Sequence, residues 1–295
     1  GFASVLEALC HEGWDRIYIE LDSKNDKVDI ALEANHVIVK SIQVKSTINI
    51  FKKIESFPPN EIKSEEEAEI CLSLTDHFKD RKLKEHLDWN RDIYEKLESF
   101  LRINTDKKRA YQLLWSTHCS IAFAAGRILN SKEGINIFPV QKTATHGTEL
   151  WDVKLSPGRE YPKWKISDSG PVENKYDTAL ILNVTRNNDV INYVEESNIP
   201  VGRLIDCTLE ENGATNFSVQ DGTHASLLAN LIYDAIGGRN LAERRAVLHI
   251  FAAAPNALMF FLGQNSMGFG KCILYEYDFE KRSSCTYSPS FDFTN

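Results

Sequence analysis

The spacing of apolar and polar residues divides the chain into three stretches of different character. In the first stretch, residues 2–14 have apolar positions at helical spacing up to Gly13. The segments 15–21, 27–32 and 37–47 then alternate or run apolar and are rich in β-branched residues. Helical spacing indicates an amphipathic helix, and alternation indicates strands. The first stretch is therefore predicted to fold as a helix, a strand and a β-hairpin.

The second stretch, residues 61–108, is highly charged, contains no Gly or Pro, and has apolar residues at helical spacing. This pattern predicts two helices whose charges face solvent. The simplest interpretation is a helical segment that joins two domains.

The third stretch begins near Tyr111, and its predicted strands alternate with helices. The predicted helices cover 187–197, 223–238 and 255–263, and the predicted strands cover 118–126, 135–141, 177–185, 200–209, 245–254 and, as the last strand, 271–279. Strands that are apolar throughout favour a mainly parallel sheet covered on both faces. The strand–helix unit occurs twice, from Ser120 and from Thr178, which indicates two Rossmann-like halves in an α/β fold.

Composition narrows the class of protein. The 295 residues suggest two domains, and no apolar run approaches the length of about 20 residues that spans a bilayer. The six cysteines form no C-x-x-C pair, which argues against a zinc site or a disulfide framework and favours a reducing cytoplasm. The net charge of −8 argues against a protein that merely coats nucleic acid. Because the first residue is not Met and no secretory signal is visible, we expect a processed or incomplete chain.

The hairpin within residues 27–47 combines an acid with a Gln-x-Lys pair. Gln43 and Lys45 share one face of their strand because side chains alternate. A turn near residues 33–36 would place Asp29 opposite Ser41 or Gln43. The surroundings are basic, since residues 36–54 contain no Asp or Glu but four lysines.

Asp29, Gln43 and Lys45 have the chemistry that metal-assisted phosphodiester hydrolysis needs. Oxygen ligands hold Mg²⁺, which polarises the phosphate and lowers the pKa of bound water. Lys45 could orient that water and offset the developing charge. Gln43 and the Val44 carbonyl could supply neutral ligands, and Glu7 and Glu20 could complete the metal shell. The alternative is a hairpin whose polar side chains merely face water.

The order helix, strand, hairpin with D…Q-x-K over residues 1–55 resembles the PD-(D/E)xK restriction-endonuclease fold, in its variant that has Gln in place of the second acid. The resemblance carries over Asp29, Gln43 and Lys45, and less directly Glu7 and Glu20. It departs from the family pattern because Val28, not Pro, precedes Asp29. It implies Mg²⁺-dependent cleavage of DNA.

The third stretch resembles a SAVED domain, the sensor of CBASS antiphage effectors, built from two fused CARF-like, Rossmann-type halves. The resemblance covers residues 110–295 and rests on "HIFAAAPNA", "FFLGQ" and "LYEYDF". It implies a cyclic oligonucleotide second messenger, often a cyclic trinucleotide, made by a partner nucleotidyltransferase. It also implies that ligand binding drives homo-oligomerisation and switches on cleavage of double-stranded DNA in the cytoplasm, with no membrane involved.

Ligands of open α/β sheets bind beyond the carboxyl ends of the strands, where helix N-termini offer free N–H groups. Three segments, 139–151, 183–189 and 252–257, meet this description. The candidates for phosphate and base-edge contacts are Gln141, Lys142, Thr185, Arg186 and Asn256, with Arg203 and Gln264 as weaker ones. Trp151 could stack on a base or pack in the core.

These observations predict a nuclease core over residues 1–60, a helical segment over 61–109 and a SAVED domain over 110–295. A ligand-gated DNA endonuclease is the first hypothesis. A sensor with a catalytically silent N-terminal module and a restriction-type nuclease that reads DNA directly are the alternatives.

Overall fold

The computed structural model divides the chain into two compact units, Gly1–Ile50 and Phe51–Asn295. It describes residues 16–22, 27–34, 37–45, 50–55, 70–143, 147–153, 160–186, 190–210, 215, 218–278 and 287–294. Within the described residues no helix is long and apolar enough to cross a bilayer.

The N-terminal unit contains a three-stranded antiparallel sheet. Its strands are β1 (Arg16–Asp22), β2 (Lys27–Ala34) and β3 (Val37–Lys45), paired in the order β1-β2-β3. The predicted strand and hairpin are confirmed, and the predicted helix over 2–14 lies outside the described residues. β-branched and other apolar residues alternate with polar ones along these strands, which is the pattern of a sheet with two different faces.

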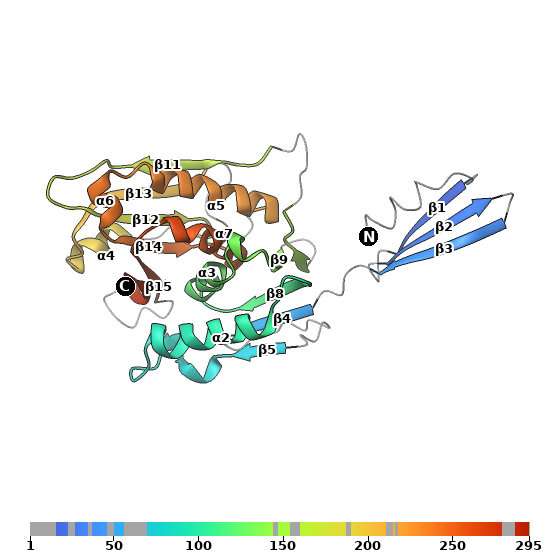
Figure 1. Ribbon diagram of the computed structural model, residues 1–295. Coiled ribbons are helices and arrows are strands. Elements are labelled where there is room, and N and C mark those ends of the chain that lie inside the picture. The colour runs from blue at the N-terminus through green and yellow to red at the C-terminus, as the bar shows by residue number, and fades with distance from the viewer. Residues whose placement is uncertain are drawn as a thin grey trace. The chain divides into compact units, whose positions relative to one another are not determined.

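The larger unit is built on two sheets (Figure 1). The five-stranded sheet has the order β10-β9-β8-β4-β5, formed by Gly147–Leu150, Asn136–Thr143, Ala110–Ser116, Ile50–Glu55 and Ile70–Ser73. The six-stranded sheet has the order β11-β13-β12-β14-β15-β16, formed by Trp164–Asp168, Val201–Leu209, Asp177–Asn183, Leu248–Ala253, Cys272–Tyr277 and Tyr287–Phe293. Its four central strands are parallel and its outer strands antiparallel, as the apolar runs predicted.

Both faces of the six-stranded sheet are covered. Leu180 and Leu182 of β12 belong to the main core, whereas Ala179 and Ile181 pack with Tyr193 on the other face. The covering helices are α3 (Cys119–Ile128), α4 (Val190–Glu196), α5 (Gly222–Gly237), α6 (Leu241–Arg245) and α7 (Asn256–Asn265). Alternate side chains of one strand thus stabilise two cores, which explains why residues 179–182 are all apolar.

Two of the strand predictions for this unit are wrong. Residues 118–126 form the beginning of α3 rather than a strand, because a helix that is buried all round shows no amphipathic period. Strand 272–277 is not the last, since β16 follows it.

In the described part of the charged stretch, residues 70–108, there is one α-helix where two helices were predicted. Helix α2 (Glu95–Asn104) continues from a π-helical turn, Trp89–Tyr94. Upstream, β5 pairs with β4, and Phe78–Lys79 (β6) pairs with Lys82–Leu83 (β7) in a short hairpin. Asp80 and Arg81 have positive φ angles of 50° and 61°, the conformation that a tight hairpin turn requires. Sheet pairing and this turn override the helical pattern of the sequence.

Helices α3 and α7 cross at two glycines. A Cβ on Gly126 would lie 2.0 Å from the carbonyl oxygen of Phe260, and a Cβ on Gly263 would lie 2.0 Å from that of Phe123. Because neither contact leaves room for a side chain, the two backbones touch directly. The crossing is reciprocal. Gly126 follows Phe123 by three residues and lies against Phe260, and Gly263 follows Phe260 by three residues and lies against Phe123.

The reciprocal crossing identifies the internal repeat. The unit β8–α3–β9 matches the unit β14–α7–β15, because 15 positions separate Tyr111 from Gly126 and Leu248 from Gly263. In both units the second strand is parallel to the first. The predicted start at Ser120 is therefore wrong in position, because Ser120 lies in α3, whereas a strand–helix–strand unit, β12–α4–β13, does begin beside Thr178 as predicted.

Candidate functional site

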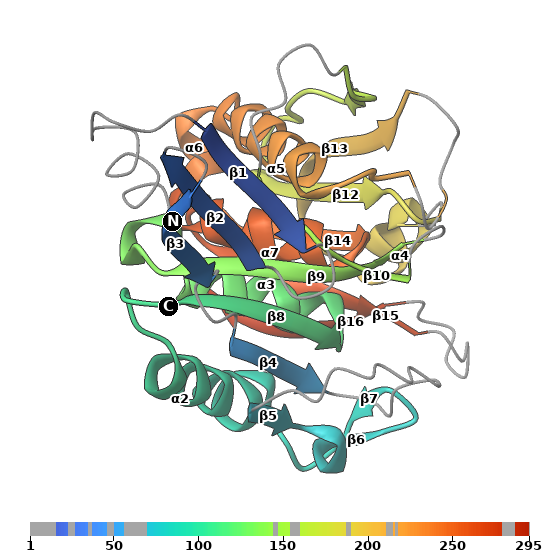
Figure 2. The same ribbon diagram turned by 90° about the vertical axis from the view of Figure 1, so that its right-hand side faces the viewer.

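Several parallel strands of the larger unit end on the same side of the molecule, and in Figure 2 the arrowheads of β4, β8 and β12 point the same way. We call the residues that end or follow β8, β9, β12, β14 and β15 the carboxyl-terminal pole. They include Thr117, Gln141, Arg186, Asn256 and Glu276. Ligands of α/β sheets bind at this end of the strands, so the pole is the candidate site.

Hydrogen bonds tie the α7 side of the pole together. Asn256 Nδ2 donates to the Thr117 carbonyl at 3.0 Å, and the Ala257 N–H donates to Gln141 Oε1 at 3.3 Å. The N–H groups of Val184 and Thr185 both donate to the Ala253 carbonyl. Four of the predicted residues, Gln141, Thr185, Arg186 and Asn256, are thus brought to one place from three strand ends.

The α3 side of the pole holds a carboxylate that the sequence analysis missed. The Ser120 N–H donates to Glu276 Oε1 at 2.7 Å, and the Ser120 hydroxyl hydrogen-bonds Ser290 Oγ at 2.6 Å. Since His118, the residue before the helix, makes no side-chain cap, Glu276 satisfies one of the free N–H groups of α3. The signal in the sequence is an acid at the end of a buried strand.

One anionic and one cationic group, Glu276 and Arg186, lie close enough to act on Cys119, the first residue of α3. Arg186 lies over the Tyr277 ring, with its guanidinium carbon 3.7 Å from the ring centroid. Burial, with a smaller contribution from Glu276, raises the pKa of the Cys119 thiol to about 12, and Arg186 opposes this rise. Cys119 is therefore a neutral thiol at pH 7 and not a nucleophile.

The β6–β7 hairpin borders the α3 side of the pole. His118 Nε2 donates to the Arg81 carbonyl at 2.8 Å, and Phe78 stacks on the His118 ring. Lys82 pairs with Asp278, just beyond β15, at 2.7 Å. The hairpin therefore brings exposed lysines and an arginine to this edge of the pole.

Three predicted ligand residues are engaged elsewhere. Arg203 lies near the amino end of β13, where it makes a bidentate ion pair with Asp168, at 2.9 and 2.6 Å, and bonds Glu243 at 3.1 Å. Gln264, near the end of α7, donates to the Leu129 carbonyl. Trp151 is 2% exposed in the core, the alternative role that the sequence left open. Of Lys142 the structure describes only the backbone, in β9 beside Gln141.

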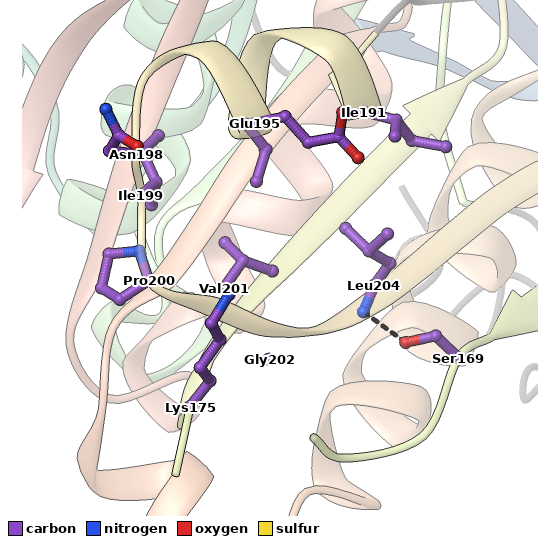
Figure 3. Close-up of a pocket in the computed structure, with 11 residues that line it drawn as sticks. Ser169, Lys175, Ile191, Glu195, Asn198, Ile199, Pro200, Val201, Gly202 and Leu204 are labelled. Carbon is purple, nitrogen blue, oxygen red and sulfur yellow. Dashed lines mark hydrogen bonds between the residues drawn. The ribbon is translucent and has the colours of Figure 1, made fainter. Parts of the chain in front are cut away.

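One pocket of about 540 Å³ lies away from this pole, between α4 and the start of β13 (Figure 3). Ser169 Oγ accepts a hydrogen bond from the Leu204 N–H at its edge. Its lining is largely aliphatic, with Lys175 and Glu195 as its charged residues, and it contains none of the predicted ligand residues. We place the candidate site at the pole because the convergent donors, acceptors and cation are there.

In the N-terminal unit, backbone register aligns the predicted catalytic positions. Asp29 is paired with Gln43 on β3 and with Glu20 on β1, so these three positions form one row across the sheet. Lys45, two positions after Gln43 and paired with Lys27, belongs to the next row on the same face. The predicted pairing of Asp29 with Gln43 is confirmed for the backbone, and Glu7 lies outside the described residues.

Known proteins resemble this chain at the level of sequence. Residues 93–293 match the SAVED family, described as the SMODS-associated and fused to various effectors sensor domain. The CD-NTase-associated protein 4 of Enterobacter hormaechei subsp. hoffmannii is 35% identical over 225 residues, which are 76% of this chain and 44% of that protein.

Solved structures share the fold. The Acinetobacter baumannii Cap4 SAVED/CARF-domain containing receptor with the cyclic trinucleotide 2′3′3′-cAAA has a TM-score of 0.60 at 14% identity, over 84% of this chain and 52% of the receptor. The corresponding receptor of Moraxella osloensis has a TM-score of 0.55 at 16% identity, over 84% and 50%. This chain therefore spans about half the length of the relatives that it matches.

The family match covers most of the larger unit, including both crossing helices and the whole six-stranded sheet. The chain belongs to the SAVED family of sensor domains.

Proposed function

We propose that this chain senses a cyclic oligonucleotide at the carboxyl-terminal pole, as part of an antiphage defence effector. The observation that supports this most directly is the convergence of two related strand–helix units, whose helices α3 and α7 both begin at the pole. The fold is that of receptors solved with cyclic trinucleotides. A ring of phosphates and bases needs N–H donors, amides and cations close together, and the pole offers all three.

Individual residues have separate roles in this proposal. Arg186 and Lys142 supply positive charge for phosphate oxygens, while Gln141 and Asn256 supply amides that can read base edges. Thr185, whose N–H donates to the Ala253 carbonyl, positions the backbone that leads to Arg186. Arg203, Gln264 and Trp151 support the fold and have no part in ligand contact.

We further propose that ligand binding drives homo-oligomerisation and activates cleavage of double-stranded DNA by the N-terminal unit. The row of Glu20, Asp29 and Gln43 offers two carboxylates and an amide, the oxygen ligands that Mg²⁺ prefers. Bound there, Mg²⁺ would supply Lewis-acid chemistry, and Lys45 would offset charge on the phosphate. A nucleotidyltransferase would make the messenger.

Plasmid cleavage with Mg²⁺, with and without 3′3′3′-cAAA and other cyclic oligonucleotides, tests this function. Cleavage only with ligand supports the proposal. Binding without cleavage supports the second candidate, a sensor with a catalytically silent N-terminal module. Ligand-independent cleavage at defined sequences would contradict both and indicate a nuclease that reads DNA directly.

A further inference from the structure

The two halves of the pole exchange hydrogen bonds between equivalent residues. Gln141 of β9 accepts from the Ala257 N–H at the start of α7, and Glu276 of β15 accepts from the Ser120 N–H at the start of α3. The strand registers make Gln141 and Glu276 equivalent. Ile137 pairs with Tyr111 and Cys272 pairs with Leu248, the two residues that correspond in the repeat. Gln141 lies four positions after Ile137, and Glu276 lies four positions after Cys272. Each half therefore caps the helix of the other half.

The two caps differ in charge. Gln141 presents a neutral amide oxygen to α7 at 3.3 Å, whereas Glu276 presents a carboxylate oxygen to α3 at 2.7 Å. Charge-assisted hydrogen bonds are shorter and stronger than neutral ones. A negative group is thus already bound at the start of α3, where an anion would be stabilised by the helix dipole.

The charged groups around Glu276 do not remove the difference in charge between the Glu276 cap and the Gln141 cap. Arg186 lies on Tyr277, beside β15, and Lys82 is paired with Asp278. His118 is buried, and burial lowers its pKa, so the ring is neutral near pH 7. Arg186 and the exposed cations of the β6–β7 hairpin are the positive groups on this side, where a carboxylate is already bound at the start of α3.

We propose that Glu276 is a specificity-determining residue that makes the pole asymmetric, an inference that rests on the proposed function. Its carboxylate acts as an internal anion at α3, so the phosphates of a bound ring are held chiefly on the α7 side, around Gln141 and Asn256. A ring that places phosphate next to Glu276 is disfavoured by like-charge repulsion.

A reciprocal pair of substitutions in the full chain tests this role. Glu276→Gln keeps an oxygen acceptor for the Ser120 N–H and removes the charge, and Gln141→Glu adds a charge at the equivalent place on the other side. We expect the affinity for 3′3′3′-cAAA, measured by calorimetry at low salt, to increase about tenfold in the first variant and to decrease about tenfold in the second. Both effects should diminish at high salt.

The outcomes separate this inference from the proposed function. If the wild-type chain binds the ring and Glu276→Gln leaves the affinity equal or weaker, Glu276 is only a structural cap and the inference is overturned. If Gln141→Glu binds as tightly as wild type, the asymmetry is also overturned. Absence of binding by the wild type and by Glu276→Gln would overturn the proposed function as well. Thermal unfolding of each variant shows whether it is folded.

Discussion

Gly126 of α3 and Gly263 of α7 occupy equivalent places in two crossing helices, and each lies against a carbonyl oxygen of the other helix. At this point the two halves of the sensor touch through backbone atoms. Phe123 and Phe260, the residues that supply those carbonyls, are fully buried. The crossing therefore fixes how the helix N-termini of both halves are presented at the pole.

A methyl group at either glycine should separate the helices. We expect Gly126→Ala and Gly263→Ala each to lower the free energy of unfolding by at least about 2 kcal/mol, because the new Cβ would overlap backbone atoms that cannot rotate away. Urea denaturation measures this. Gly237→Ala is the matched control, since nothing lies within 4 Å of its Cβ position, and its unfolding free energy should change by less than about 1 kcal/mol. Equal effects in all three variants would contradict the direct backbone contact.

Acid should destabilise the larger unit before its carboxylates titrate. Burial lowers the pKa of His118, which Glu276 partly opposes, and that of His249, which its hydrogen bond to Asp177 partly opposes. In the unfolded chain both rings titrate near pH 6.5, so below that pH the unfolded state binds more protons. This contribution to stability is complete above about pH 6.5 and decreases as the pH falls.

Urea midpoints between pH 7.5 and 5.5 test this dependence. His118→Gln retains an N–H donor for the Arg81 carbonyl and should show a smaller loss on acidification than the wild type. Replacing the exposed His86 by Gln should leave the pH dependence unchanged. A midpoint that stays constant or rises towards pH 5.5 would show that these rings are not held neutral by the fold.

Two arginines that the sequence analysis proposed as ligand contacts, Arg186 and the weaker candidate Arg203, should behave in opposite ways. Arg203→Gln removes the ion pairs with Asp168 and the buried Glu243 and should lower the free energy of unfolding by about 2–4 kcal/mol, with little change in ligand affinity. Arg186→Gln should weaken binding of 3′3′3′-cAAA about tenfold and leave the unfolding midpoint within about 1 °C. Calorimetric binding and thermal unfolding of both variants provide the comparison; a ligand defect in a folded Arg203→Gln chain would restore its predicted binding role.

Lys45, on the same face of the sheet as the row of Glu20, Asp29 and Gln43, should affect DNA cleavage but not ligand affinity. Lys45→Ala should abolish ligand-dependent cleavage of plasmid DNA while the affinity for the cyclic oligonucleotide stays unchanged, because the ligand site belongs to the other unit. Lys40, paired with Leu32 and not aligned with the Asp29–Gln43 row, provides the control. Lys40→Ala should retain cleavage. Loss of both binding and cleavage in Lys45→Ala would identify a structural role.

The sequence predicted eight of the sixteen strands in the described part of the chain, those whose apolar runs are bounded by clear turn residues, and it predicted α5 and α7 from their spacing and terminal glycines. It did not predict the other eight, among them β8 and β16. It failed for α3, whose burial on all sides removes the amphipathic period. It also failed for residues 70–87, where pairing with β4 and the left-handed turn at Asp80 and Arg81 outweigh a helical charge pattern.

The sequence predicted only part of the candidate site. Gln141 lies near the end of β9, and Thr185, Arg186 and Asn256 follow β12 and β14 within three residues. A parallel sheet brings such residues to one edge. Arg203 could not be assigned from spacing alone, because its partners Asp168 and Glu243 are distant in sequence. Glu276 becomes the counterpart of Gln141 only through the strand registers, which pair Ile137 with Tyr111 and Cys272 with Leu248. Aligning "FAAG" with "FFLG" in the sequence would instead place Asp278 opposite Gln141.

The central claim is that the larger unit binds a small ring of phosphates and bases. Calorimetric titration of the full chain with cyclic trinucleotides, including 2′3′3′-cAAA and 3′3′3′-cAAA, tests it most directly. We predict saturable binding with a Kd of about 1 μM or tighter for at least one ring, corresponding to about −8 kcal/mol, and weaker binding in Arg186→Gln. Absence of heat and of any thermal stabilisation with every cyclic oligonucleotide tested would contradict the account.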